Sequence, residues 1–386
     1  MQINDTKYNE VKIRLTEKIK KMKAGERLPG ERELARIFGF SYMTIRRAVE
    51  DLVEDKSLYR IPRKGTFVSN PRNNDVTTGN IGFYLYEKLK HGISSPYYSL
   101  VFKAIQKEFS AHGYNLIFFT DPKSVNLDNL DGVVATAFSV MRQELLELSS
   151  KKPVIMTDND VVGLDIPAVV VDNYNSTYTA IEYAISTGHK IIGYIHGILD
   201  YSVGVKRLAG YTTALDNYGI ARDDSLLYQG DYEYSSGYEA SGYFLSLQNR
   251  PTFIHCANDL MAMGLIKGFI EAGIRVPEDI SVSGFDNIGP ASTFHPSITT
   301  MAVDFDRIAR ETVKLMIAEI KNENVNFKKL IIPASLIIRE SSAVLEVPDN
   351  GIGVRSDAES IMKSIQNVSD FNDKENRNIN DTSVLK

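Results

Sequence analysis

Hydrophobic positions in residues 1–70 first recur at helical spacing and then alternate. Residues 7–23, 31–38 and 41–54 each carry an apolar stripe on one face, and Ser41 stands where a helix N-cap is expected. Residues 58–68 alternate apolar and polar positions on either side of the turn-forming sequence Pro62-Arg63-Lys64-Gly65. The pattern predicts three helices followed by a β-hairpin, which is the order of a winged helix-turn-helix.

From residue 81 onward, short apolar runs alternate with longer amphipathic segments. The predicted strands are 81–86, 114–119, 131–135, 153–157, 168–171, 190–195, 225–229, 252–256, 280–284 and 329–338, and the predicted helices are 98–112, 140–150, 176–187, 204–218, 235–248, 259–272 and 304–321. This alternation is typical of α/β folds with parallel sheets covered by helices on both faces. The strands form one set up to residue 157 and a second set from residue 168. They therefore predict two lobes, with ligands bound in a cleft at the carboxyl ends of the strands.

Composition indicates where these parts meet. Residues 70–80 contain one apolar residue among many turn formers, and residues beyond 347 are rich in Asn, Asp and Ser. We expect a head at 1–69, a linker at 70–79, a two-lobed body at 80–343 and a disordered tail at 347–386.

The net charge of −5 is an average over two unlike parts. Residues 1–70 contain 16 Lys and Arg against 10 Asp and Glu, a net charge of +6, which leaves −11 on the remainder. A basic head on an acidic body is expected when one domain meets phosphates and the other does not. The single cysteine, Cys256, fits a reducing cytoplasm, and we find neither a secretion signal nor an apolar run of membrane-spanning length.

The third predicted helix carries candidate DNA-reading residues. Met43, Arg46, Arg47 and Glu50 lie opposite its apolar stripe. Arginines near the start of such a helix can bond bidentately to guanine in the major groove, and Arg63 and Lys64 at the hairpin tip could reach a minor groove or phosphates. A solvated helix with two arginines is the alternative that this helix leaves open when it is taken alone.

The combination of motifs in residues 7–69 closely resembles the winged helix of the GntR family of bacterial regulators. The matching strings are Leu28-Pro29-x-Glu31-Arg32-Glu33-Leu34-Ala35, Gly39-x-Ser41-x-x-Thr44-Ile45-Arg46-x-Ala48 and Arg63-Lys64-Gly65-Thr66-Phe67-Val68. The resemblance implies DNA contacts by Arg32, Thr44, Arg46 and Gly65, and at position 42, where this chain has Tyr42. Ser41, Arg47, Arg63 and Lys64 complete the candidate DNA-binding residues, and the last three add positive charge. Tyr42 stands where the family usually has arginine, and Pro62-Arg63 replaces the usual Gln-Gly, so we expect an atypical operator sequence.

Residues 80–343 resemble the effector domain of the LacI/GalR regulators, which is similar to periplasmic sugar-binding proteins. The motifs are Ser94-Ser95-Pro96-Tyr97-Tyr98, Val171-Asp172-Asn173, Gly188-His189, Arg207-Leu208-Ala209-Gly210-Tyr211, Ala257-Asn258-Asp259 and the run from Val276 to Asp286. The resemblance implies that a sugar is bound by Arg207, Asn258 and Asp286 at its hydroxyls, by Tyr232 stacking on its ring, and by Tyr98, Asp158 and Tyr201.

Two features of this second resemblance leave alternatives open. Asn258 could instead simply cap the helix predicted at 259–272, and Asp172 the helix predicted at 176–187. The joining of the two kinds of domain, with the string Gly204-Val205-Lys206-Arg207, resembles regulators of the arabinose-repressor type and implies a pentose-like effector.

The remaining chemistry does not indicate an enzyme. The six histidines lack ligand-pair spacing, Cys256 has no partner, and no nucleophile elbow, phosphate loop or dinucleotide glycine motif occurs. We expect no metal and no cofactor. The prediction is a cytoplasmic homodimeric repressor of carbohydrate-utilisation genes, whose binding to a palindromic operator is relieved by a small sugar. Activation, a non-sugar effector and a DNA-binding head fused to a sugar-processing enzyme are the alternatives.

Overall fold

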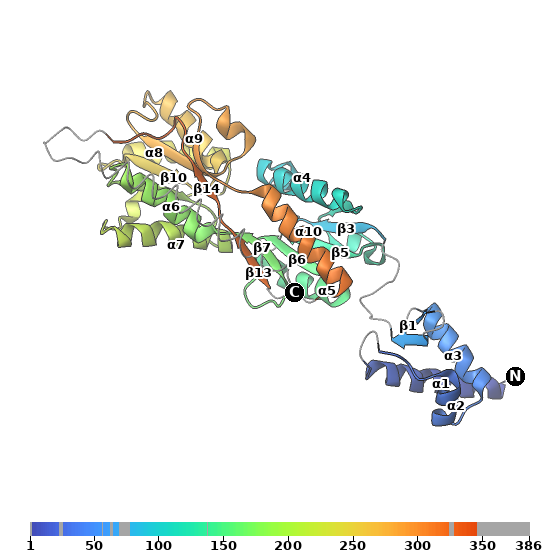
Figure 1. Cartoon of the computed structure of the whole chain (residues 1–386). Helices are drawn as coiled ribbons and strands as arrows, with labels where there is room; N and C mark the ends of the chain where they lie inside the picture. Colours follow the sequence, from blue (N-terminus) through green and yellow to red (C-terminus); the bar gives the residue numbers. More distant parts are fainter. Residues whose placement is uncertain are drawn as a thin grey trace, which may run out of the picture.

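The computed structural model describes residues 2–22, 26–55, 57–61, 65–68, 78–136, 138–323 and 328–345 (Figure 1). The predicted linker and tail therefore fall almost wholly outside the described residues, as do Arg63 and Lys64.

The head consists of three helices and a two-stranded antiparallel sheet, as predicted. Its elements are α1 (Gln2–Lys20), α2 (Glu31–Phe38), α3 (Tyr42–Glu54), β1 (Leu58–Ile61) and β2 (Gly65–Val68). Gly39 adopts φ +72° and ends α2, and Ser41 accepts a hydrogen bond from Thr44 N as the N-cap of α3. The apolar stripes of the three helices and residues of the hairpin pack into one core, which includes Val11, Leu15, Leu34, Ile45, Val49, Leu52 and Leu58.

The first lobe is a six-stranded parallel sheet in the order β13-β7-β6-β5-β3-β4. Its buried strands are rich in β-branched residues, because both faces of a parallel sheet are covered by helices. The elements are β3 (Asn80–Tyr84), α4 (Pro96–Ala111), β4 (Asn115–Phe119), β5 (Gly132–Thr136), α5 (Arg142–Lys151), β6 (Val154–Asp158), β7 (Ala168–Val171), α10 (Phe305–Lys321) and β13 (Lys329–Ile332).

The second lobe has the sheet order β14-β12-β11-β10-β8-β9, in which only β12 and β14 pair antiparallel. The elements are α6 (Asn173–Ser186), β8 (Ile192–His196), α7 (Ser202–Asn217), β9 (Leu227–Gln229), α8 (Tyr234–Ser246), β10 (Phe253–Cys256), α9 (Asp259–Glu271), β11 (Ser281–Asp286), β12 (Thr299–Ala302) and β14 (Ser335–Ile337). Short 3-10 helices occur at Gly92–Ser94, Pro122–Ser124, Leu127–Asn129, Ser139–Met141, Asp224–Leu226 and Gly289–Ser292.

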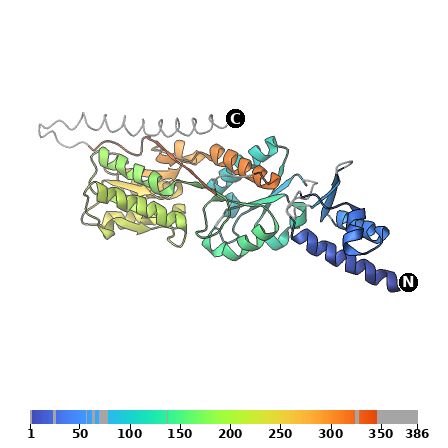
Figure 2. The same ribbon diagram turned by 60° about the horizontal axis from the view of Figure 1, so that its bottom comes forward.

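The chain passes between the lobes three times, between β7 and α6, between β12 and α10, and between β13 and β14. Figure 2 shows the two lobes as separate layered units joined by these extended segments. The predicted α/β architecture with a winged helix-turn-helix head and two lobes is therefore confirmed. No helix in the described part of the chain is both long and apolar enough to cross a bilayer.

Three predictions about strands were wrong in detail. Strand 168–171 belongs to the first lobe rather than the second, since β7 pairs with β6 and β13. The predicted single strand 329–338 is two strands in different sheets, because Pro333 has no N–H to continue the ladder and the chain changes lobes there. The strand Thr299–Ala302 was not predicted.

Candidate effector pocket and DNA-reading surface

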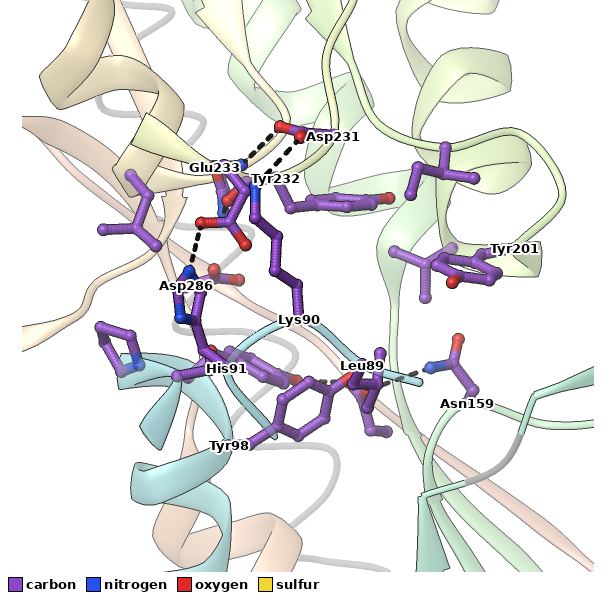
Figure 3. A pocket seen from close by; sticks show the side chains of 18 of the residues that line it. Leu89, Lys90, His91, Tyr98, Asn159, Tyr201, Asp231, Tyr232, Glu233 and Asp286 are labelled. Atoms are coloured by element: carbon purple, nitrogen blue, oxygen red, sulfur yellow. Dashed lines mark hydrogen bonds and ion pairs between the residues drawn. The ribbon is translucent and has the colours of Figure 1, made fainter. Parts of the chain in front are cut away.

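A cavity of about 260 Å³ lies between the two lobes. Its walls come from residues 88–98 and the end of β6 in the first lobe, and from residues 198–207, 231–233 and the end of β11 in the second. All seven residues proposed for effector binding line it, namely Tyr98, Asp158, Tyr201, Arg207, Tyr232, Asn258 and Asp286. Figure 3 shows four of them, Tyr98, Tyr201, Tyr232 and Asp286, around the cavity. The cavity sits at the carboxyl ends of β6 and β11, where open α/β sheets bind ligands.

Arg207 is the buried cation of this cavity. Its position on α7 lets Nε donate to Asn173 Oδ1 at 2.8 Å and Nη1 donate to the carbonyl of Ala257. The guanidinium carbon lies 3.6 Å from the centre of the Phe285 ring, and Nη2 lies 3.6 Å from Asp286 Oδ1. These contacts fix the guanidinium against the second lobe and orient it for a ligand.

Asp286 brings a buried carboxylate to the end of β11. Burial raises the pKa of this carboxyl well above its usual range, and the charge of Arg207 opposes that rise. The 3.6 Å separation from Arg207 exceeds an ordinary hydrogen bond, so the carboxylate retains capacity to accept from ligand hydroxyls.

Asp158, at the end of β6, is held by two tyrosines. Its carboxylate accepts from the hydroxyl of Tyr97 at 2.5 Å and from that of Tyr98 at 3.3 Å, and Asn159 Nδ2 donates at 3.0 Å. Burial raises the pKa of Asp158, and the hydrogen bond from Tyr97 works against that rise. Sequence reasoning missed Tyr97, although its place beside Tyr98 after the helix-starting Pro96 was a usable signal.

Tyr232 packs its ring into a gap left by a glycine. A Cβ atom at Gly197 would overlap with Cζ of Tyr232. The tyrosine ring therefore occupies the space that the side chain of any other residue at position 197 would need. Burial raises the pKa of Tyr232 to about 12. Its buried hydroxyl has no hydrogen-bond partner among the residues that the structure describes.

Asn258 and Tyr201 have structural contacts as well as places on the cavity wall. Asn258 Oδ1 accepts from Met261 N at 2.9 Å, as an N-cap of α9, and Nδ2 donates to the carbonyl of Tyr232 at 2.8 Å. The capping role considered for Asn258 is therefore present. The Tyr201 ring packs edge-on against Phe138 of the first lobe, with 4.9 Å between centroids.

Three non-glycine residues of the cavity have left-handed backbones. Asp158 has φ +70°, Tyr232 has φ +69° and Asp286 has φ +104°. Such conformations cost roughly 1–3 kcal/mol each and tend to cluster at functional sites. Their convergence on one cavity is an independent sign that the cavity binds a ligand.

Two side-chain contacts join the lobes at this cavity, and sequence reasoning found neither. Lys90 Nζ lies 3.6 Å from Asp231 Oδ2, and His91 Nε2 lies 3.1 Å from Glu233 Oε2 (Figure 3). Each pair connects a residue of the first lobe with the loop before α8. No group of His, Cys, Asp and Glu suited to a metal ion occurs among the described residues.

On the head, α3 exposes the side chains expected to read DNA. Tyr42, Arg46 and Arg47 are exposed, and Thr44 is half-buried beside the capping Ser41. The guanidinium of Arg47 lies over the ring of Tyr8 in α1, at 4.8 Å from its centre.

Two further predicted DNA contacts, Arg32 and Gly65, lie in the described part of the head. Arg32 is exposed on α2, and Gly65 begins β2 with φ +128°. A Cβ at Gly65 would lie 2.8 Å from Nε of Arg27, so a larger residue would crowd that arginine as well as strain the backbone.

Two family models match the chain. Residues 7–68 match the model of bacterial regulatory proteins of the gntR family, and residues 181–342 match that of a periplasmic binding protein-like domain. The two matches confirm the resemblance of the head to the gntR family and that of the body to a periplasmic binding protein-like effector domain.

Curated relatives include HTH-type transcriptional repressors PurR. The PurR of Klebsiella pneumoniae is 31% identical over 260 residues, which cover 64% of this chain and 76% of that protein. The PurR of Mannheimia succiniciproducens is 29% identical over 64% of this chain and 78% of its own length. These relatives are transcriptional regulators, in agreement with the expectation that the chain is not an enzyme.

Solved structures share the fold. The transcriptional regulator CelR–cellobiose complex has a TM-score of 0.62 and 23% identity, covering 80% of this chain and 95% of that one. A LacI family transcriptional regulator from Enterococcus faecium with bound ribose has a TM-score of 0.61 and 23% identity, covering 69% of this chain and all of that one. A transcription regulator from Lactobacillus plantarum reaches 27% identity with a TM-score of 0.61, over 69% of this chain and all of its own.

Proposed function

Because this chain belongs to the LacI/PurR type of transcriptional regulators and carries a gntR-family head, we propose that it represses carbohydrate-utilisation genes in the cytoplasm. In this proposal residues 1–69 bind a palindromic operator as part of a homodimer, 70–79 link the domains and 80–343 bind the effector. The effector is a neutral monosaccharide, such as an arabinose-like pentose, bound between the lobes, and it relieves repression.

The observation that carries this proposal is the meeting of Arg207, Asp158 and Asp286 with buried tyrosines in one cavity. A polyol offers several hydroxyls that donate and accept hydrogen bonds, and it presents C–H faces to aromatic rings. Carboxylates accept two bonds each and a guanidinium donates several in a fixed plane, which suits adjacent hydroxyls. The cavity volume of about 260 Å³ favours a small ligand.

The charge of the cavity favours a neutral effector over an anionic one. Two buried carboxylates, Asp158 and Asp286, face one buried guanidinium, Arg207. Burial already raises the pKa of both acidic groups by disfavouring their charged forms. A sugar phosphate or sugar acid would place a further negative charge beside them in a site of low dielectric, where like charges repel strongly. Cellobiose and ribose in the solved regulators named above are neutral sugars, in line with this expectation.

The effector would act by changing the position of the two lobes relative to each other. Ligand that contacts both lobes stabilises their closed arrangement, which changes how two bodies pack in the dimer and how far apart the heads lie. Because such coupling is reciprocal, operator must weaken effector binding by the factor by which effector weakens operator binding.

The proposal is tested by titrating the full chain on operator DNA with neutral pentoses and hexoses and with their phosphates. The operator is the duplex that the protein enriches from a random-sequence library, and binding is followed by fluorescence anisotropy. We expect one neutral sugar to release the DNA and to raise the melting temperature of the free protein. Release by the phosphates alone, or by no sugar, would contradict the sugar assignment.

An Asp286→Asn variant tests the role of one proposed effector contact. It keeps the size of the side chain but replaces one acceptor oxygen by a donor. We expect it to bind operator like the wild type and to require at least about tenfold more sugar for release. An unchanged response in this variant would remove Asp286 from the proposed site.

A further inference from the structure

The exposed surface of the DNA-reading helix contains an acidic side chain between two arginines. Glu50 Oε1 accepts from Arg46 Nε at 2.9 Å and lies 3.9 Å from Arg60 Nη1, which comes from β1. Arg60 Nη2 in turn donates to Glu31 Oε1 at 2.6 Å. The two arginines and Glu50 keep between two-fifths and half of their side-chain surface exposed.

Stability alone does not account for this arrangement. Exposed ion pairs four residues apart on a helix are worth only about 0.3–0.5 kcal/mol. A carboxylate on a surface that faces DNA also repels phosphates, so Glu50 lowers the affinity of the head for every DNA sequence. A side chain that lowers affinity for DNA in general and adds little stability can still increase specificity. It does so when it lowers the affinity for unrelated sequences more than the affinity for the operator.

The geometry supplies such a selective effect. Because Glu50 binds Nε of Arg46, the two Nη groups of this arginine, which has Tyr42 as a second neighbour, are the ones that can donate to O6 and N7 of a guanine. In the major groove, the N4 amino group of cytosine donates to carboxylates, whereas the N6 amino group of adenine stands beside the N7 acceptor, which repels a carboxylate. Where another base takes the place of this cytosine, Glu50 lacks its best donor and instead keeps Arg46 and Arg60 from the phosphates.

We propose that Glu50 is a sequence-discriminating residue of this head, which occupies Arg46 and Arg60 on unrelated DNA and accepts the amino group of one cytosine in each operator half-site. This role is independent of the nature of the effector.

The test compares Glu50→Gln with Glu17→Gln in the full chain. Both variants remove one negative charge from the head, but Glu17 is an exposed residue of α1, outside the DNA-reading helix. Dissociation constants are measured at several salt concentrations for the duplex enriched by the wild type and for a shuffled duplex of the same composition. Circular dichroism and melting temperature check the fold of each variant.

We expect Glu50→Gln to reduce the ratio of operator affinity to shuffled-duplex affinity about fivefold or more. On the shuffled duplex, the slope of log affinity against log salt concentration should become more negative by about one to two, because the freed arginines contact phosphates. Glu17→Gln should change both affinities by the same small factor. Equal changes in both affinities for Glu50→Gln would overturn the proposal.

Selection from the random library provides a second readout. The sequences that Glu50→Gln enriches should lose their preference at one C·G pair in each half-site and keep the others. If wild type and variant enrich the same sequences, Glu50 does not contact a cytosine and the proposal is wrong. A Glu50→Ala variant should lose the same preference, which separates loss of the carboxylate from any new contact made by glutamine.

Discussion

His91 Nε2 and Glu233 Oε2 lie 3.1 Å apart, and this contact joins the first lobe to the second at the cavity. The neighbouring pair Lys90 and Asp231 does the same at 3.6 Å. The cavity is therefore bounded by contacts that require the lobes to lie close together, so any opening of the lobes would break them.

A Lys90→Ala/His91→Ala double variant should bind the effector about two- to thirtyfold more weakly, because exposed pairs such as these two are worth about 0.2–1 kcal/mol each. Calorimetric titration of the free protein would measure the loss, with Lys103→Ala on α4 as the control for removal of an exposed lysine. The difference in effector affinity between the wild type and the double variant should become smaller at high salt, because salt screens exposed charges. Equal affinities at low salt would show that these pairs do not stabilise closure.

Gly197→Ala should abolish effector binding or weaken it more than about tenfold. The new methyl group would overlap with the ring of Tyr232 and displace it into the cavity. Gly242→Ala on α8 is the matched control, because a Cβ there meets no atom within 4 Å and alanine favours a helix. Operator binding should be unchanged in both variants. A fully responsive Gly197→Ala protein would contradict the packing of Tyr232 described here.

Arg207→Leu should lower the free energy of unfolding by about 3–5 kcal/mol, since it leaves the buried Asp286 without its cation. Adding Asp286→Asn should recover part of this loss without restoring effector binding, because the charge penalty disappears and the ligand contacts do not return. Urea denaturation and calorimetric titration measure the two quantities separately. If the double variant is no more stable than Arg207→Leu, the loss of stability in Arg207→Leu does not come from leaving the Asp286 carboxylate buried without a cation.

Asp259 should make stability depend on pH. It is fully buried, accepts from Thr300 Oγ1 at 2.6 Å and from Ile288 N at 2.9 Å, and burial raises its pKa to about 7. In the unfolded chain its pKa is near 3.9. Between these values the native state binds a proton that the unfolded state has released, so the contribution of Asp259 to stability falls as the pH rises.

Comparison with Asp259→Asn isolates this effect from other groups. Asparagine loses one acceptor and lowers stability at every pH, but it does not titrate. The stability advantage of the wild type over the variant should therefore shrink from pH 4 to pH 7, by up to about 1.4 kcal/mol per pH unit. An advantage that is constant over this range, measured by urea denaturation, would contradict the raised pKa.

Local patterns in the sequence were enough to predict most elements and both domain types. Ser41 and Gly39 mark helix ends through their own backbone and side-chain preferences, and apolar periodicity reports which face of each segment is buried. Of the seven candidate effector residues, Asp158 and Asp286 end strands, whereas Tyr98 and Arg207 lie on helices that follow strands. Strand ends of parallel sheets meet at one edge, and the helices that follow begin there.

What the sequence determined by itself was therefore the set of local conformations and the family likeness. Only the tertiary structure decided which strand joins which lobe, as the separation of β13 and β14 at Pro333 illustrates. It also brought Lys90 to Asp231, Tyr97 to Asp158 and Arg60 to Glu50. Such pairs depend on the path of the chain between distant segments. The free energy that selects that path comes from burial summed over a whole lobe, which no local pattern contains.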